Sequence, residues 1–336
     1  MVPLMNSPAN ATAAPATSAA PKRKERDPYV DSRVAAAVQL LITVLNVLPA
    51  GVARWFGRSV GRLMWRVDKR HRNNVLRHME IAFRDGKTRA EREELCRKFF
   101  EHLGLSAVEF ARLEKLNREN VDELCDLSEL KKFDELLARG KGLLCVPAHH
   151  GNWELCGYAV ALKGYPIQSV ARPLDNPHLD ALITSIRERA GNTIIQKWKV
   201  LWKLKKLLDR GAIVTMSIDQ NGGTGGVFVP CFGTLASTIS SPAELHLVTG
   251  VPILIATMNR KPDGIHHVLR VWDVIEHAKT GDHESDVRAV TARINAAVEK
   301  AVREYPEQWL WLHKRWKTRP PGEAESSDGL PPRLAS

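Results

Sequence analysis

The densest group of reactive side chains lies in segment 148–154, which reads Ala-His-His-Gly-Asn-Trp-Glu. An apolar run at 142–146 precedes it and a helical pattern at 153–162 follows, so His149 is predicted in a strand-to-helix turn. A carboxylate bound to one imidazole nitrogen fixes the tautomer and raises the basicity of the other nitrogen. We therefore expect Glu154, in the first helical turn, to contact His149 and make it a general base. Alternatively, the histidines cap the helix and Glu154 interacts only with its dipole.

Two further polar residues follow predicted strands. Arg172 comes after the strand at 166–171, and Asp219 comes after the strand at 212–218. The carboxyl ends of parallel strands meet at one edge of a sheet, where open α/β folds bind their ligands. We expect His149, Arg172 and Asp219 to converge there. Arg172, or backbone N–H groups near Gly151 and Asn152, would offset the charge that develops during the reaction.

Other reaction types have weaker support. The sequence contains no Gly-x-Ser-x-Gly elbow, no His-Glu-x-x-His helix, no Gly-x-Gly-x-x-Gly turn and no phosphate-binding loop with its lysine. The glycine-rich run 222–226 is expected to form a mobile loop over the site. A zinc site at Cys145, His149 and Cys156 lacks a fourth ligand. These observations favour a histidine base that transfers an already activated group, without a metal or a cofactor.

The pattern around these residues predicts an α/β fold. Helical periodicity extends over 88–140, and strands and helices alternate afterwards, which is typical of a mainly parallel central sheet with flanking helices. A capping box with Pro242 at the first helical position predicts a helix start near Ser241. The predicted strands are 142–146, 166–171, 193–196, 212–218, 251–258 and 267–274, and the main helices are 153–162, 177–190, 199–208 and 287–303.

The N-terminal region predicts contact with a membrane. Residues 1–30 have the composition of a disordered basic tail. Residues 34–53 carry no charge and form either a single span or an interfacial helix. Next comes an arginine strip with aromatic neighbours, which suits a helix among lipid phosphates and acyl chains, or simply a solvated basic face. The arginine strip consists of Arg54, Arg58, Arg62 and Arg66.

Composition limits the remaining possibilities. The chain has 336 residues, a formal charge of +11, 44% hydrophobic and 26% charged residues, which excludes a disordered, collagen-like or polytopic membrane protein. Five cysteines without a Cys-x-x-Cys pair indicate reduced, mostly buried thiols. The charge favours anionic partners. A basic nucleic-acid-binding protein would explain the charge, but not the polar residues at strand ends.

Five motifs in order resemble one enzyme family. The His-x4-Glu segment is followed by Ser-Val-Ala-Arg-Pro at 169–173, Ser-Ile-Asp-Gln-Asn at 217–221, Val-Pro-Cys-Phe-Gly at 229–233, and a tryptophan-rich motif at 307–317. Together they resemble the late acyltransferases of lipid A biosynthesis, within the glycerolipid and lysophospholipid acyltransferases. The likeness covers about residues 35–320 and implies anchoring helices at 31–84, an acyltransferase domain at 85–320 and a flexible tail at 321–336.

The resemblance also implies an activity. Such enzymes move an acyl chain from acyl carrier protein or acyl-CoA to a hydroxyl of a lipid A precursor, at the cytoplasmic face of the inner membrane and without nucleic acid. A phosphatidylinositol mannoside or a lysophospholipid is the alternative acceptor. Catalysis falls to His149 and Glu154. Substrate binding falls to Asn152, Arg172, Asp219 and Gln220.

Tryptophans with cationic neighbours occur twice more. Trp309, Trp311 and Trp316 suit either a membrane interface or the core of a terminal element. Trp198 and Trp202 lie among lysines that could contact lipid phosphates or an acidic acyl carrier protein.

Overall fold

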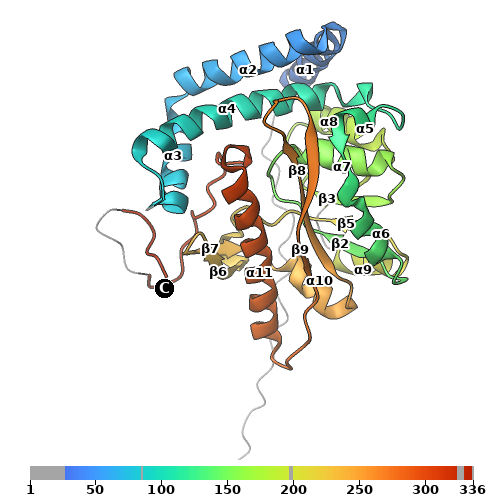
Figure 1. Cartoon of the computed structure of the whole chain (residues 1–336), viewed down its shortest axis with the longest axis vertical. Coiled ribbons are helices and arrows are strands. Elements are labelled where there is room, and N and C mark those ends of the chain that lie inside the picture. Colours follow the sequence, from blue (N-terminus) through green and yellow to red (C-terminus); the bar gives the residue numbers. More distant parts are fainter. Residues whose placement is uncertain (1–26, 85, 197–199, 324–328, 335–336) are drawn as a thin grey trace, which may run out of the picture.

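A seven-stranded sheet forms the centre of the molecule (Figure 1), in the order β1-β9-β8-β2-β5-β3-β4. The computed structural model describes residues 27–84, 86–196, 200–323 and 329–334. All strand pairs in this sheet are parallel except β8–β9, because six connecting residues suffice only for a hairpin. The predicted mainly parallel α/β fold is confirmed. The strands are β1 (Cys125–Asp126), β2 (Leu143–Cys145), β3 (Ile167–Ala171), β4 (Thr193–Gln196), β5 (Ile213–Thr215), β8 (Ile253–Arg260) and β9 (His267–Ile275).

The helices that flank the sheet follow the predicted pattern closely. The α7 boundaries agree with the prediction, and α11 begins four residues before the predicted 287. At α10, however, the N-cap is Ser240 and its side chain makes no capping bond, so the capping box predicted at Ser241 does not form. These helices are α5 (Val121–Leu124), α6 (Lys131–Leu137), α7 (Trp153–Leu162), α8 (Pro177–Glu188), α9 (Leu201–Asp209), α10 (Ser241–Thr249) and α11 (His283–Glu304).

A second sheet was not predicted. It is the hairpin of β6 (Val227–Cys231) and β7 (Thr234–Thr238), whose turn places Phe232 and Gly233 at positive φ angles of 54° and 69°. The glycine-rich run predicted to be a mobile loop forms a short 3-10 turn, Gly223–Gly225, beside this hairpin. The Gly222 N–H donates to the carbonyl of Ser237 (2.9 Å), so the run is fixed to β7 rather than extended over the site.

Four N-terminal helices form a layer over one end of the sheet (Figure 1): α1 (Pro28–Val47), α2 (Ala50–Val67), α3 (Lys69–Phe83) and α4 (Arg89–Ala111). Glycines let α2 and α4 approach closely. A Cβ at Gly61 would lie 2.2 Å from the carbonyl oxygen of Phe100, and a Cβ at Gly104 would lie 2.1 Å from that of Gly57. Only glycine fits at these contacts, so the two helices pack backbone to backbone.

The outer surface of α1 and α2 is apolar. Of the described helices, α1 is the one long and apolar enough to cross a bilayer, judged by length and composition, and most of it is exposed. This is weak evidence for membrane association. Their exposed large apolar side chains are Tyr29, Val30, Val34, Leu40, Leu41, Val44, Val47, Val52, Trp55, Phe56, Leu63, Met64 and Val67.

The arginine strip is only partly available to lipid. Arg62 donates to the Glu101 carboxylate of α4 (2.8 Å), and Arg58 lies 3.9 Å from the same group. Arg54, one turn earlier, has no carboxylate partner among the described residues. Half of the predicted strip therefore fastens α2 to α4.

The two ends of the chain differ from the predicted tails where they are described. Residues 1–26 lie outside the described residues, and α1 already begins at Pro28. Near the other end, Leu330 is buried in the main core and Arg84 donates to the carbonyl of Pro331 (3.0 Å). Residues 329–334 therefore contact the domain, which the prediction of a flexible tail did not include.

Candidate active site

Two of the predicted residues meet at the ends of neighbouring strands. His149 follows β2 and Asp219 follows β5, and these strands pair in parallel. Imidazole Nδ1 lies 2.8 Å from Asp219 Oδ1, and the His149 backbone N–H donates to Oδ2, also at 2.8 Å. The convergence of His149 and Asp219 expected from their strand-end positions is what the structure shows.

The Asp219 carboxylate is buried and accepts three hydrogen bonds. Besides the two from His149, it accepts the indole N–H of Trp309 at 2.9 Å. Burial alone would raise its pKa, but the neighbouring imidazole and the three donors outweigh burial and lower the pKa of Asp219 to about 2. Asp219 is therefore ionised near neutral pH, and its charge is directed at His149.

The imidazole of His149 is oriented for proton transfer. With Nδ1–H donating to Asp219, Nε2 has no hydrogen-bond partner among the described residues, and the side chain is 23% exposed. Burial favours the neutral ring, but the Asp219 charge and hydrogen bond prevail and raise the pKa of His149 above its ordinary value. The edge-on ring of Trp153, 5.3 Å away between centroids, borders the imidazole.

Glu154 does not contact the imidazole as predicted. Its carboxylate accepts two hydrogen bonds from Arg187 of α8, from Nε (2.8 Å) and from Nη2 (2.5 Å). The reason is local: α7 begins at Trp153 with Asn152 as its N-cap, and the first helical turn carries Glu154 toward α8. Asp219, on the adjacent strand, occupies the position beside Nδ1. Glu154 acts on His149 only through space, where its charge helps to raise the imidazole pKa.

Arg172 and Gln220 lie at predicted strand ends but do not join this cluster. The Arg172 guanidinium is 58% exposed and pairs with Asp175 three residues later (3.0 Å). The backbone carbonyl of Gln220 accepts a hydrogen bond from Arg315 (3.1 Å). No contact of either side chain with His149 or Asp219 is found among the described residues. Their roles in substrate binding stay predictions.

The Asn152 side chain is occupied by hydrogen bonds within the protein and does not face an open site. It is buried, its Oδ1 caps the N–H of Leu155 (3.0 Å), and its amide donates to Glu109 of α4 (2.8 Å). The backbone N–H groups of Gly151 and Asn152 donate to the carbonyls of Gln308 and Met258. They are therefore occupied within the protein, and the expectation that they stabilise an oxyanion is wrong.

Gly151 holds the turn against β8. Its φ is +65°, and a Cβ there would lie 1.9 Å from the carbonyl oxygen of Met258. Behind it, the His102 side chain contacts the Gly151 carbonyl (3.1 Å), and burial lowers the pKa of His102 to about 3, so a neutral ring donates this bond. His150 is likewise neutral, its pKa lowered to about 4 by burial, and donates to the carbonyl of Tyr305 (3.0 Å). These two histidines fix the turn that presents His149.

The C-terminal segment, residues 309–316, closes the site from the other side. The Leu310 N–H donates to the carbonyl of His149 (2.9 Å), and the Trp309 indole binds Asp219. Trp309, Trp311 and Trp316 are buried in the main core, so of the two predictions for them the core assignment is confirmed. Trp202 of α9 is 77% exposed, while Trp198 lies outside the described residues.

Sequence reasoning missed two residues of this site. Arg187 carries no motif and reaches Glu154 from the last turn of a crossover helix, so only the packing of α7 against α8 reveals it. Trp309 belongs to the tryptophan-rich motif at 307–317, but its donation to Asp219 depends on the packing of two segments that are 90 residues apart in the sequence. All five cysteines are buried and unbonded, as predicted, and no group of three or more potential metal ligands was found in the described part of the chain.

Comparison with known proteins identifies the family of this chain. The family model for bacterial lipid A biosynthesis acyltransferases matches residues 23–318. The chain belongs to this family. It is 29% identical over 277 residues to the lipid A biosynthesis lauroyltransferase of Escherichia coli, an alignment that covers 82% of this chain and 88% of that protein.

Two further relatives are similarly distant. The lipid A biosynthesis palmitoleoyltransferase of E. coli is 27% identical over 279 residues, covering 82% of this chain and 89% of that protein. The phosphatidylinositol mannoside acyltransferase of Mycolicibacterium smegmatis is 23% identical over 212 residues, covering 61% and 66%. This family member is therefore an acyltransferase, and its relatives are named for different acyl chains and acceptors.

Proposed function

We propose that the protein transfers an acyl chain from a thioester donor to a hydroxyl of a lipid A precursor, with His149 as general base. The observation that carries this proposal is the state of the imidazole: Nδ1 is held by the ionised Asp219 carboxylate, while Nε2 has no partner in the described part of the chain. An imidazole in this arrangement accepts a proton at Nε2, and the resulting cation is stabilised by Asp219.

The reaction follows from these positions. The acceptor hydroxyl donates its hydrogen bond to His149 Nε2 and loses the proton to it as the oxygen attacks the thioester carbonyl. The tetrahedral intermediate carries the negative charge on the former carbonyl oxygen. When it collapses, the C–S bond breaks, and the proton on His149 is available to the leaving thiolate. No further reactant is needed, because the thioester is already activated.

Arg187 is the cationic group that we assign to the oxyanion. Its Nε and Nη2 bind Glu154, while Nη1 has no partner among the described residues. Its charge is close enough to His149 to oppose protonation of the ring. In this proposal the Glu154 side chain, predicted as the direct partner of His149, instead positions Arg187 for the developing charge.

The substrates are assigned by relationship. The relatives with the widest coverage are named for lipid A biosynthesis, which supports a lipid A precursor as acceptor. Because the mycobacterial relative is named for a phosphatidylinositol mannoside, this lipid is the alternative acceptor to test. We propose acyl carrier protein as the donor, with acyl-CoA as the alternative. The apolar surface of α1 and α2 supports action at a membrane. We propose that this is the inner membrane, with the catalytic domain on its cytoplasmic face.

Replacing His149 with alanine tests the mechanism. We expect His149→Ala to lower transfer by about 10³-fold or more, because the variant loses the group that accepts the hydroxyl proton. Binding of the acyl donor should remain measurable. The matched control is His283→Ala, a well exposed histidine, which should retain full activity. Transfer of radiolabelled acyl chains to each acceptor, read by thin-layer chromatography, measures both variants. Unchanged turnover in His149→Ala would remove the assignment.

A further inference from the structure

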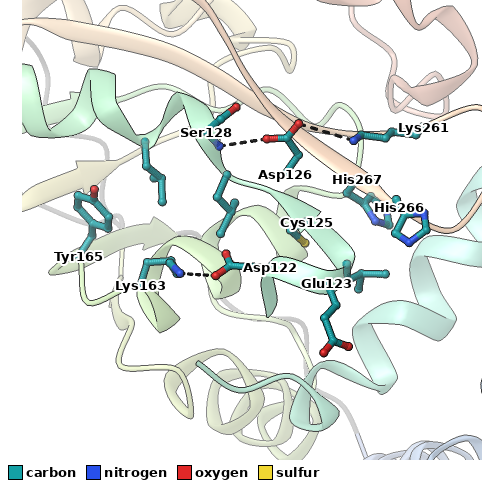
Figure 2. A pocket seen from close by; sticks show the side chains of 13 residues that line it. Asp122, Glu123, Cys125, Asp126, Ser128, Lys163, Tyr165, Lys261, His266 and His267 are labelled. Carbon is teal, nitrogen blue, oxygen red and sulfur yellow. Dashed lines mark hydrogen bonds and ion pairs between the residues drawn. The ribbon is translucent and has the colours of Figure 1, made fainter. Parts of the chain in front are cut away.

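Two cavities flank the hairpin that connects β8 to β9, and their charges differ. The larger, of about 600 Å³, lies between the β1 region and this hairpin (Figure 2). Its lysines already have partners: Lys163 binds Asp122 (2.7 Å) and Lys261 lies 3.6 Å from Asp126. The cations of this cavity are neutralised within the protein, so it offers no net attraction to an anion.

The smaller cavity, of about 410 Å³, lies between α2, the end of α4 and the same hairpin. Its cationic groups are Arg54, Arg112 and Lys115. None of the three has a carboxylate partner among the described residues. Arg54 and Arg112 are close enough for the charge of Arg54 to assist burial in lowering the pKa of Arg112. Arg112 donates through Nη1 to the carbonyls of Leu45 and Leu48, but these carry no charge. The two partly buried guanidinium groups thus repel each other, with no carboxylate bound to either among the described residues.

The carboxylates that line the smaller cavity do not neutralise its three cationic groups. Glu109 is partly buried and bound to Arg260, with Nη2 of the arginine 2.7 Å from Oε2, so its charge is already balanced. Glu123 is exposed and lines both cavities. His266 is paired with Asp263 of the hairpin (2.8 Å). Positive charge therefore remains, and arginine is the side chain best suited to bind phosphate.

The rest of the cavity suits a phosphate that carries a lipid. Apolar groups share the lining with the arginines, and they are Ala50, Val108, Leu116, Leu124, Leu155 and Ile265. The cavity also lies at the start of α2, where the exposed apolar surface of the N-terminal layer continues. We propose that this cavity is an anion site, distinct from the site of His149, which binds the phosphate monoester of a lipid headgroup through Arg54 and Arg112.

The site is connected to the catalytic turn but separate from it. Neither His149 nor Asp219 lines the cavity. The connection is Glu109, which lines the cavity and accepts a hydrogen bond from the Asn152 amide beside the turn. Binding a phosphate there requires no acyl transfer. The proposal therefore stands or falls independently of the mechanism, and His149→Ala protein should still bind the phosphate.

Titration calorimetry of the full chain in detergent tests the site. The probes are dihexanoyl phosphatidic acid, which carries a phosphate monoester, dihexanoyl phosphatidylcholine, and inorganic phosphate. We expect saturable binding of phosphatidic acid and none of phosphatidylcholine. Arg54→Gln should weaken the affinity about tenfold, the loss of one charge-assisted contact. Arg54 donates no hydrogen bond to a described residue, so this change leaves the fold intact.

Arg58→Gln is the matched control. It removes the same charge one helical turn away, where the guanidinium faces Glu101, and should change affinity less than twofold. Equal weakening by both variants would mean a diffuse surface effect and would overturn the site, as would the absence of phosphatidic acid binding. Inorganic phosphate that competes with phosphatidic acid at similar affinity would overturn the lipid as the ligand. Competition at much weaker affinity, sensitive to Arg54→Gln, would support it.

Discussion

Helix α2 and the C-terminal segment have similar compositions and opposite environments. Each combines tryptophan with arginine, and each was a candidate for the membrane interface. In the structure Trp55 of α2 is 69% exposed, whereas Trp311 of the C-terminal segment is buried in the main core. Composition alone therefore does not determine which of the two environments a tryptophan-rich segment occupies.

The arginines of the two segments explain why one segment is buried and the other exposed. Arg315 is buried, and its guanidinium donates to the carbonyls of Ser237 and Gln220 and to the Thr238 hydroxyl. A buried charge is tolerated only where its donors are satisfied, and the β6–β7 hairpin supplies two of these acceptors, at Ser237 and Thr238. On α2, Arg54 finds no such set and borders a cavity instead. Because the donors of Arg315 are satisfied within the protein, the C-terminal segment can be buried beside the site. Because those of Arg54 are not satisfied by the described residues, this part of α2 is open to other molecules.

The largest expected effect concerns Asp219, the buried carboxylate that contacts His149, the proposed general base. Asp219→Asn removes the charge that raises the His149 pKa. A base must be neutral to act, so the rate rises with pH through that pKa, and loss of the carboxylate moves this rise to lower pH. The maximal rate should fall on the order of 10³-fold, because the amide no longer stabilises the imidazolium. The pH profile of kcat/KM measures both effects.

Asp175→Asn is the control for this comparison, since Asp175 is exposed and pairs with Arg172 outside the cluster. Its pH profile should match that of the unaltered protein. If Asp219→Asn left the profile in place, or moved the rise to higher pH, Asp219 would not be the group that sets the basicity of His149.

The sequence predicted the fold better than it predicted the site. Periodicity and glycine positions located α7 and the parallel strands other than β1, because these depend on local patterns of apolar residues. The two-residue strand β1 lies within the stretch 88–140 that was predicted to be helical. The meeting of His149 with Asp219 was foreseen because strand ends share an edge. The Glu154–Arg187 pair was not, since it depends on how α7 packs against α8. The β6–β7 hairpin was also missed, because Phe232 at positive φ gives no turn signal in the sequence.

A second test compares the stability contributed by the two tryptophans. Trp311 is buried and its indole donates to the carbonyl of Pro306 (2.7 Å), so Trp311→Ala should lower the free energy of unfolding by about 3–5 kcal/mol. Trp55→Ala should change it by no more than about 0.5 kcal/mol, because the side chain is largely exposed. Urea unfolding of both variants in the same detergent measures the difference. Similar losses in the two variants would contradict the contrast between the segments.

The smallest expected effect concerns where the protein meets lipid. Trp55 of α2 and Trp202 of α9 are both exposed and both have cationic neighbours, and Figure 1 shows α9 well away from α2. The exposed apolar side chains around Trp55 continue along α1, so Trp55→Ala should weaken binding to anionic vesicles about fivefold, roughly 1 kcal/mol. Trp202→Ala should change it less than twofold, as measured by vesicle sedimentation. The reverse ranking would place the lipid-binding surface at α9 and leave the N-terminal layer for another partner.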